Sequence, residues 1–366
     1  MNTTKSSNYG KLIAFFLIAS VLLCILGFAA EGWQEKPESP KIEGVGDLMD
    51  NNKNEQIGTG DLIDQSKPQA PIFINPLTGL EATPLIAATR PVSFVIDSNS
   101  PIYGLGCADI LIEIPTESNS TRFMCITGNY RSIGKIGSLL PTRGFISNLA
   151  SYFGSILVSS GNDDTVEYAS IDNSAYHFDL NRTNGYFYTE YNSLKYTNGA
   201  LIEAGIKNSN INSLVESDFS LPFEFSSEKQ TSDGALTCNS LKIPLSPDSQ
   251  TELIFSSETN KYTLTKNGEA RIDLLYDKPL EYENVFVLFS DCMTYESSKG
   301  TELIMDTVTS GLGYYAADGV LCRIQWKVTD GNLKFFDDKG ELLLAKKGTS
   351  YISLIKSSKI DSVVFS

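Results

Sequence analysis

Charged side chains at the ends of two predicted apolar elements are the first candidates for chemistry. Arg143 opens a predicted helix over residues 142–153, and Asp97 ends a predicted strand over residues 91–97. Ligands of open α/β sheets bind at the carboxyl ends of strands, and the free N–H groups of a first helical turn favour anions. The sequence therefore predicts a pocket for an anion or a polar glycan. Its candidate ligand-binding residues are Arg143, Arg122, Glu117, Asp97 and Asp109.

The same residues also have a structural interpretation. Glu117 with Arg122, and Asp109 with Arg143, would form ion pairs that fix the strands. This interpretation is preferred, because buried charges are normally paired and a single arginine identifies no ligand.

Motifs that would indicate catalysis are too weak to assign one. Glu113 and Glu117 are a carboxylate pair of the kind that glycosidases use, but Pro115 follows the first at a predicted strand end, so their spacing does not place them on one helix face. Ser132 and Lys135 match the Ser-x-x-Lys motif of acyl-enzymes, which occurs often by chance, and its companion Lys-Thr-Gly is absent. We therefore predict no catalytic residue.

Metal and cofactor sites are not predicted either. His177 is the single histidine, which excludes a multi-histidine metal centre and leaves a Ser-His-Asp triad one possible base, with no nucleophile indicated beside it. Residues 162–164 are rich in oxygen ligands but lack the spacing of a twelve-residue calcium loop.

Five aromatic residues between 186 and 196 either stack on sugar rings or cap the core, and both alternatives stay open. They are Tyr186, Phe187, Tyr188, Tyr191 and Tyr196.

Composition narrows the class of protein. The chain has 366 residues, 41% of them hydrophobic, and a formal net charge of −15 at pH 7. A sizeable core is therefore available, and an acidic chain repels phosphate backbones, which argues against nucleic-acid binding.

The N-terminal segment predicts where the protein is located. Leu12 to Ala30 carries no charge and no proline, and Lys5 and Lys11 precede it. Such a run predicts a single-pass membrane helix, with residues 1–11 in the cytoplasm and the rest of the chain outside the cell membrane. Two alternatives remain: a cleaved signal peptide and lipidation at Cys24.

Residues 31–71 are acidic and poor in clustered apolar residues, which predicts a flexible tether.

The elements that would position these residues divide the chain in two. Strands over 91–97, 108–114, 121–127 and 155–159 alternate with helices over 142–153 and 198–204, which predicts an α/β domain over residues 72–220. Short alternating runs separated by Asn-Gly, Asp-Gly and Lys-Gly turns predict a mainly antiparallel β domain over residues 221–366. The expected fold class is therefore α+β with an N-terminal membrane helix.

The cysteines do not form a disulfide framework. Five follow Cys24, at widely spaced positions, and buried apolar thiols are expected for most of them. Cys107 with Cys125, or Cys292 with Cys322, would pair if neighbouring strands bring them together.

In order and spacing, these turns and strands resemble the YerB-like bacterial "putative lipoprotein" family, over roughly residues 74–355. The resemblance is carried by residues 75–80, 90–92, 97, 108–110, 113, 117, 121–123, 136–137 and 143, then by 262, 267–268, 273, 284–285, 311–313, 318–319, 326–327, 336–337 and 340. It implies two domains and an extracytoplasmic location, and no particular reaction. Members usually carry an arginine where Leu140 stands, and histidines at the positions of Ser159 and Arg271 and near Tyr191 or Asn192.

The missing histidines favour a role without catalysis. We therefore expect a membrane-anchored extracytoplasmic module that binds cell-wall glycan or an envelope protein. The alternative is a hydrolase or transferase directed at the cell wall. The expected contact with the membrane is through Leu12 to Ala30.

Overall fold

The computed structural model describes residues 71–117, 120–162, 174–183, 185–215, 219–227, 235–246, 249–297 and 300–366. The predicted membrane segment at 12–30 and the predicted tether at 31–71 lie outside the described residues, apart from the last position of the tether. Among the residues that are described, no helix is both long and apolar enough to cross a membrane.

Four apolar strands form one half of the main sheet. They are β3 (Val92–Asp97), β4 (Ile110–Pro115), β5 (Thr121–Thr127) and β7 (Ile156–Ser159). Nearly every residue in them is buried, which suits short apolar runs covered on both faces. β5 lies between β3 and β4 and pairs antiparallel with both, whereas β7 pairs parallel with β3 and continues to β8 (His177–Asp179).

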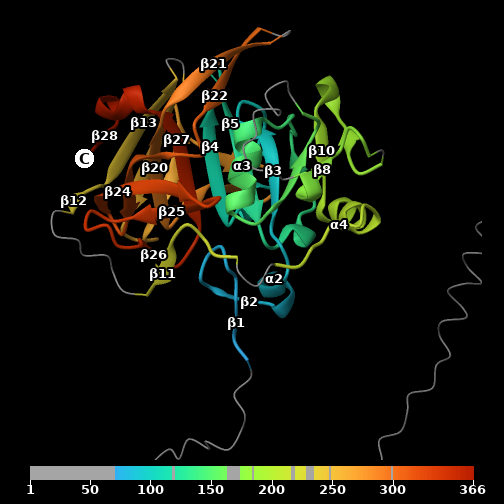
Figure 1. The fold of residues 1–366 in the computed structure, drawn as a ribbon, viewed down its shortest axis with the longest axis horizontal. Helices are drawn as coiled ribbons and strands as arrows, with labels where there is room; N and C mark the ends of the chain where they lie inside the picture. Colours follow the sequence, from blue (N-terminus) through green and yellow to red (C-terminus); the bar gives the residue numbers. More distant parts are fainter. Residues whose placement is uncertain are drawn as a thin grey trace, which may run out of the picture. The chain divides into compact units, whose positions relative to one another are not determined.

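The same sheet continues into strands from the C-terminal part of the chain. β4 pairs parallel with β27 (Ser350–Lys356), and β27 pairs parallel with β20 (Asn284–Ser290). The sheet then runs antiparallel through β23 (Ser310–Ala317) and β24 (Val320–Thr329). Beyond them, β12 (Leu236–Thr237) and β25 (Asn332–Phe336) both pair with β24. Figure 1 shows β27 and β4 beside each other at the centre of the fold. Strands from both sides of residue 220 therefore share one sheet.

A second sheet covers one face of the first. Its strands are β13 (Ser240–Ser246), β14 (Ser249–Ser256), β15 (Lys261–Lys266), β16 (Glu269–Ala270), β19 (Glu281–Tyr282) and β28 (Val364–Phe365). Leu253 and Tyr262 from this sheet belong to the same buried cluster as Phe94 and Tyr351 from the main sheet. This cluster is the larger part of the core.

The helices cover the opposite face and one edge. α3 (Gly144–Tyr152) places Phe145 and Leu149 in a second buried cluster, together with Ile112 and Phe286 of the main sheet. α4 (Gly199–Asn208) begins at Asn198, whose side chain caps the helix, and lies at the β8 edge (Figure 1). The short α2 (Pro84–Ala88) lies beside β1 (Phe73–Ile74) and β2 (Glu81–Ala82).

Smaller ladders complete the fold. They are β6 (Ile136–Gly137) with β10 (Lys195–Thr197) and β9 (Tyr188–Thr189), β11 (Glu224–Ser226) with β26 (Leu344–Lys346), β17 (Ile272–Asp273) with β18 (Lys278–Pro279), and β21 (Cys292–Ser297) with β22 (Gly300–Met305).

The predicted α+β class is wrong, because the described residues are mostly β. The predicted helix over 142–153 is present as α3. Along the chain it comes after β3 and directly before β7, and these two strands pair in parallel. However, β4 and β5 are joined by a tight connection in which Thr116 N–H bonds to the Ser120 carbonyl, so they pair antiparallel. Alternating strands and helices along the sequence therefore did not produce an α/β layer arrangement.

Candidate functional site

Arg143 and Glu117, two of the predicted ligand-binding residues, bind each other. Arg143 is the N-cap of α3, and its side chain is 2% exposed. Its Nη1 and Nη2 atoms donate to the two Glu117 oxygens at 2.6 and 2.8 Å, and Nη1 also donates to the Leu303 carbonyl at 3.2 Å. Burial acts to raise the pKa of Glu117, but the hydrogen bonds from Arg143 outweigh it and lower the pKa to about 2. The guanidinium thus holds a carboxylate of its own chain bidentately.

Asp97 and Arg122 lie opposite each other on β3 and β5. Asp97 accepts hydrogen bonds from Asn99 N–H and Ser100 Oγ at 2.9 and 2.7 Å, and so closes a local turn. Arg122 donates to the Pro141 carbonyl at 2.7 Å. Both side chains therefore fix the local backbone at this end of the sheet.

Asp109 lies at the start of β4, apart from the other candidates. Its carboxylate accepts hydrogen bonds from Asn75 Nδ2 at 3.0 Å and from Gly128 N–H at 2.7 Å. Burial raises its pKa to about 6, against the effect of these hydrogen bonds. The ion pair that the structure gives Arg143 is with Glu117, where the sequence predicted Asp109. Ligand binding by any of the five candidates stays a prediction.

Members of the predicted aromatic group pack mainly against residues outside the group. Tyr196 is 3% exposed, stacks on Tyr188 and meets Tyr103 edge-on. The Lys135 ammonium lies over the Tyr103 and Tyr196 rings, at 3.9 and 4.2 Å from their centroids. These contacts support the core-capping alternative for Tyr188 and Tyr196.

His177 has a neighbour that the sequence did not indicate. Its Nε2 atom lies 2.8 Å from Ser159 Oγ, because β7 and β8 pair in parallel. Ser159 is fully buried and also donates to the Gly161 carbonyl at 2.8 Å. Burial lowers the pKa of His177, so the ring is neutral at neutral pH.

A buried cluster around a charged pair joins the part of the chain before residue 220 to the part after it. Glu113 of β4 is 0% exposed and accepts hydrogen bonds from three hydroxyls: Thr121 at 2.6 Å, Thr251 at 2.9 Å and Tyr351 at 2.5 Å. Lys266 of β15 lies 3.7 Å from the same carboxylate. We call these five residues the Glu113 cluster.

The cluster extends through Lys266 toward the end of β3. Lys266 donates to Ser98 Oγ at 3.1 Å, and Arg271 donates to the Ser98 carbonyl at 2.7 Å. Burial lowers the pKa values of both Lys266 and Arg271, with Glu113 and Asp97 acting in the opposite direction. Arg271 stands where members of the YerB-like family usually have a histidine. In this structure its guanidinium binds the backbone at the end of β3.

The turn η1 (Leu105–Cys107) is fastened to the β17–β18 hairpin by Asp273. This buried carboxylate accepts hydrogen bonds from the backbone N–H groups of Gly104, Gly106 and Leu275, at 3.1, 2.5 and 2.8 Å. A Cβ atom at Gly106 would lie 2.9 Å from the Tyr276 ring, so a glycine is needed there for the close approach. With its oxygens occupied in this way, Asp273 acts as a structural anchor.

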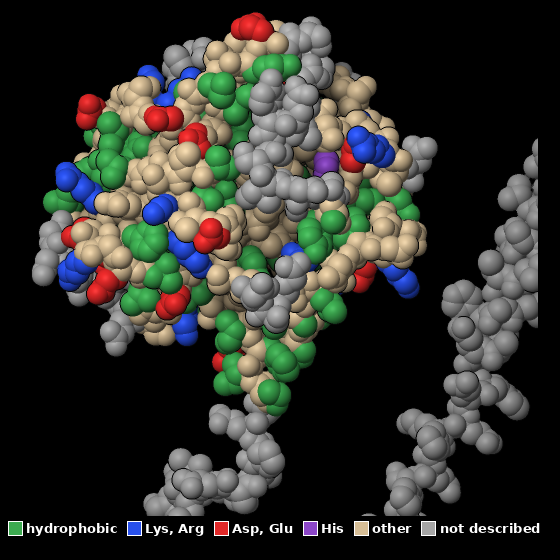
Figure 2. All heavy atoms as spheres, viewed as in Figure 1, with side chains coloured by type: hydrophobic (Ala, Val, Ile, Leu, Met, Phe, Trp, Pro, Cys, Tyr) green, Lys and Arg blue, Asp and Glu red, His purple; other side chains and the backbone are tan. Residues whose placement is uncertain are grey.

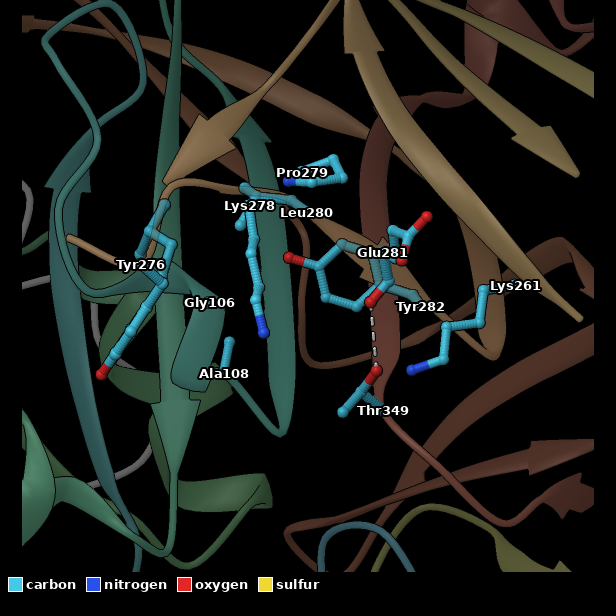
Figure 3. Close-up of a pocket in the computed structure, with 11 residues that line it drawn as sticks. Gly106, Ala108, Lys261, Tyr276, Lys278, Pro279, Leu280, Glu281, Tyr282 and Thr349 are labelled. Carbon is cyan, nitrogen blue, oxygen red and sulfur yellow. Dashed lines mark hydrogen bonds between the residues drawn. The ribbon is translucent and has the colours of Figure 1, made fainter. Parts of the chain in front are cut away.

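A cleft of about 370 Å³ opens between η1, the β17–β18 hairpin and β19. Its size is in the range of small-ligand sites. Figure 3 shows Tyr276 and Lys278 reaching into it from the hairpin, and Lys261 and Thr349 on the opposite side. Both polar and apolar side chains line it, including Leu105 and Leu280.

One lysine of the cleft is neutralised within the chain. Lys261 Nζ lies 2.9 Å from Glu283, which also accepts hydrogen bonds from Thr349 N–H and Oγ1 at 2.7 and 2.9 Å. Burial acts to raise the pKa of Glu283, but the hydrogen bonds from Lys261 and Thr349 outweigh it and lower the pKa.

Two other polar groups of the cleft lack such partners. Lys278 is exposed and, in the part of the chain that the structure describes, forms no ion pair. Tyr282 is 2% exposed, and its hydroxyl has no hydrogen-bond partner among the described residues. Figure 3 shows this hydroxyl directed to the side of the cleft where Lys278 lies. An unsatisfied buried donor beside a cation can bind an anionic or strongly polar group.

The rim of the cleft is apolar and exposed. Ile272, Leu274, Leu275 and Tyr276, all on the β17–β18 hairpin, are 36 to 50% exposed. Neighbouring exposed apolar side chains of this kind are typical of interaction sites.

A second exposed apolar group lies far from the cleft in the sequence, on β1, β2 and α2. Ile72, Phe73, Leu80 and Leu85 contribute to it. Figure 2 shows hydrophobic side chains gathered over these elements at the lower end of the molecule.

Sequence reasoning missed the cleft residues. Tyr276, Lys278 and Tyr282 lie on two-residue strands and a turn without a recognisable motif. Asp273, which anchors η1, was selected only through the family resemblance. The signal that would have found the cleft is a run of apolar residues, 274–276, in a turn where polar residues are usual.

Comparison with known proteins gives consistent matches across this fold. Residues 77–212 match "Protein of unknown function (DUF3048) N-terminal domain", and residues 241–352 match the corresponding C-terminal domain. "Putative lipoprotein YerB" of Bacillus subtilis (strain 168) is 23% identical over 299 residues, which cover 76% of this chain and 85% of that protein. The crystal structure of the B. subtilis YerB protein superposes with a TM-score of 0.69 at 21% identity, over 80% of this chain and 99% of that one. The two proteins share a fold.

Proposed function

This chain belongs to the DUF3048 family. We propose that it is a membrane-anchored extracytoplasmic module that binds a cell-wall fragment and performs no catalysis. The resemblance found in the sequence is confirmed by the matches to both domains. The family description names no activity, so the proposal rests on the cleft.

The observation that carries the proposal is the pair of unpartnered polar groups in the cleft. Lys278 offers an exposed cation, and the Tyr282 hydroxyl offers a donor that has no partner among the described residues and that a ligand reaches only after the buried side chain or its neighbours move. Tyr276 adds an exposed aromatic ring at the rim. Cell-wall glycan carries sugar rings, which stack on aromatic side chains, and its peptides carry carboxylates, which bind ammonium and hydroxyl groups.

Asp273 and Glu283, two carboxylates near the cleft, are engaged within the chain, whereas Glu281 lines the cleft itself. Asp273 is occupied by three backbone N–H groups, and Glu283 by Lys261 and Thr349. A general acid or base must reach a substrate proton with its own oxygen. Every oxygen of Asp273 and Glu283 already accepts a hydrogen bond or forms an ion pair within the chain, which makes both poor candidates for this role.

Binding is tested with soluble peptidoglycan fragments released from isolated walls. We expect Lys278→Met to weaken binding about tenfold or more, since a hydrogen bond to a charged group contributes about 1.5–3 kcal/mol. Tyr276→Ala should weaken it further by removing the ring. Lys339→Met is the matched control, because Lys339 is an exposed lysine in a turn outside the cleft. Equal binding by all variants would refute the cleft as the binding site.

The alternative function is a wall-directed hydrolase, and the contact between Ser159 and His177 is the observation that favours it. Ser159 is 0% exposed, so a substrate would reach its hydroxyl only after a rearrangement. Release of wall fragments by the purified protein, abolished by Ser159→Ala, would establish this alternative.

Anchoring is part of the same proposal. The name of the B. subtilis relative supports a lipid anchor, which the sequence allows at Cys24, and the uncharged segment around Cys24 supports an uncleaved anchor. Cys24→Ser should release the protein into the medium if a lipid is the anchor, and should leave it in the membrane if the segment itself is. In both cases, protease added to intact protoplasts should digest everything beyond Ala30. Protection of residues 72–366 would refute the extracytoplasmic location.

A further inference from the structure

The first elements of the described chain carry an exposed apolar surface. α2 consists of five apolar residues, and none of them is buried. Both residues of β1 are exposed, and so is Leu214, which forms an isolated bridge with Thr89 at the end of α2. Between residues 72 and 89 the only charged side chain is Glu81. We use the name N-terminal patch for Ile72, Phe73, Ile74, Leu80, Leu85 and Leu214, which are 37 to 62% exposed.

The patch is fastened to the rest of the fold through the turn between β1 and β2. Asn75 in this turn donates to the Asp109 carboxylate at 3.0 Å, and Leu77 is fully buried. The Thr78 carbonyl accepts a hydrogen bond from Gly348 N–H at 2.8 Å. The turn therefore fixes the β1–β2 ladder to the core, while the apolar side chains of the patch remain exposed.

The composition of the patch fits the apolar interior of a lipid bilayer. Aliphatic side chains with an aromatic ring, such as Phe73 with Leu80 and Leu85, are the types that insert at a membrane surface. Transfer of a charged group into lipid is costly, and Glu81 is the single charge in this stretch. Figure 2 shows the apolar side chains gathered on one end of the described part of the chain.

The position of the patch along the chain favours the membrane as its partner. The described residues begin at Pro71, directly before Ile72, and the anchor proposed above lies in the segment that ends at Ala30. The 40 residues 31–70 between them span at most about 140 Å when fully extended. An anchored protein therefore keeps the patch near the bilayer, where a high effective concentration makes even weak insertion sufficient.

We propose that the N-terminal patch docks on the bilayer that anchors the protein and inserts Phe73 and Leu85 among the lipid acyl chains. Docking would hold the Pro71 end of the folded part against the membrane surface. The inference rests on the anchoring proposed above, and it does not depend on a wall fragment in the cleft.

The test uses the full-length protein in phosphatidylcholine vesicles with brominated acyl chains, because bromine quenches tryptophan fluorescence only at short range. These lipids carry no net charge, so they do not repel an acidic chain of net charge −15. Trp33→Phe removes one of the two tryptophans, and the other, Trp326, is buried. Leu85→Trp then places a reporter in the patch.

Leu236→Trp, made in the same Trp33→Phe background, is the matched control. Leu236 is 47% exposed, against 51% for Leu85, and its strand β12 lies away from α2 (Figure 1). We expect brominated lipid to quench most of the added fluorescence of Leu85→Trp and to leave that of Leu236→Trp nearly unchanged. Equal quenching of the two overturns the proposal.

Serine variants separate docking from anchoring. Phe73→Ser with Leu80→Ser should reduce the quenching of Leu85→Trp about tenfold or more, since two large apolar side chains no longer enter the lipid. All these positions are exposed, so the melting temperature should stay close to that of the parent. The serine variant should still float with the vesicles. Its release would refute the anchor and would show that the patch itself holds the protein on the membrane.

A second copy of the chain is the other occupant that the experiment detects. Emission of Leu85→Trp that is blue-shifted, insensitive to bromine and lost when the protein is diluted among more vesicles would show that copies cover the patch for one another. That result would also overturn docking on the bilayer.

Discussion

Two neighbouring tyrosines belong to regions with opposite properties. The rings of Tyr351 and Tyr282 lie 5.8 Å apart, yet Tyr351 belongs to the Glu113 cluster and Tyr282 to the cleft. The Tyr351 hydroxyl donates to Glu113, whereas the Tyr282 hydroxyl has no partner among the described residues. Polar groups that satisfy one another stabilise the fold, whereas an unsatisfied buried group beside a cleft gains a partner if a small movement lets a ligand reach it. We therefore expect mutations in the cluster to lower stability, and mutations in the cleft to lower binding.

Glu113→Gln should have the largest effect on stability. The change leaves the ammonium of Lys266 in a buried site without its counter-charge. Breaking a buried ion pair by removing one partner costs about 3–5 kcal/mol, so we expect the free energy of unfolding in urea to fall by about that amount.

The matched control for this prediction is the double variant Glu113→Gln with Lys266→Met. It removes both charges and should recover a large part of the loss. If the free energy of unfolding of the single variant Glu113→Gln is within about 0.5 kcal/mol of the parent value, the Glu113 cluster does not stabilise the contact between the main sheet and the second sheet.

Arg143→Ala should have an intermediate effect. Its partner Glu117 is 27% exposed, so we expect a loss of about 2 kcal/mol at pH 7. Because folding lowers the pKa of Glu117 from 4.5 to about 2, the stabilisation is present above pH 4.5 and disappears as the pH falls toward 2. Melting curves from pH 7 to pH 2 should converge for parent and variant. Curves that stay parallel would contradict the pairing.

The same variant also tests the ligand pocket predicted from the sequence. If Arg143 binds a wall component, Arg143→Ala should weaken binding of peptidoglycan fragments even under conditions where the variant is fully folded. Normal binding by the folded variant would assign Arg143 a structural role only.

Tyr282→Phe should have the smallest effect on stability and a clear effect on binding. The hydroxyl forms no hydrogen bond with the described residues, so its removal should change the free energy of unfolding by less than about 0.5 kcal/mol. Binding of peptidoglycan fragments should weaken several-fold, as expected for the loss of one neutral hydrogen bond.

Tyr262→Phe is the matched control for Tyr282→Phe. Tyr262 is equally buried, but its hydroxyl donates to the Cys238 carbonyl at 3.1 Å. The control should therefore cost about 1 kcal/mol of stability and leave binding unchanged. If Tyr282→Phe and Tyr262→Phe changed stability and binding by the same amounts, the contrast between the hydrogen-bonded core and the cleft would be refuted.

Local structure was predictable from the sequence in several places. The predicted strand over 121–127 is β5, the strand over 91–97 is β3, and the helix over 142–153 contains α3. Each has a periodicity or an apolar run that a short window reveals.

Long-range pairing was not predictable. Nothing near Glu113 indicates that β4 pairs with β27, or that Tyr351 and Thr251 would donate to this carboxylate. The partner of Arg143 was wrongly predicted for the same reason, since Glu117 is 26 positions away from it and Asp109 is farther still, so neither pairing is visible in a local stretch of sequence. Neither of the two suggested cysteine pairings is confirmed, because the five cysteines that follow Cys24 are free thiols in the structure.

The parallel pairing of β4 with β27 also has a consequence for the order in which the chain can fold. Glu113 and Tyr351 are 238 positions apart, so one edge of β4 has no partner until almost the whole chain is available. Contacts of such separation slow folding, because a long loop must close before they form. An exposed strand edge meanwhile invites pairing with other chains. The first half of this protein therefore depends on β27, a strand close to the C-terminus, and a truncation that removes β27 should prevent folding of both halves.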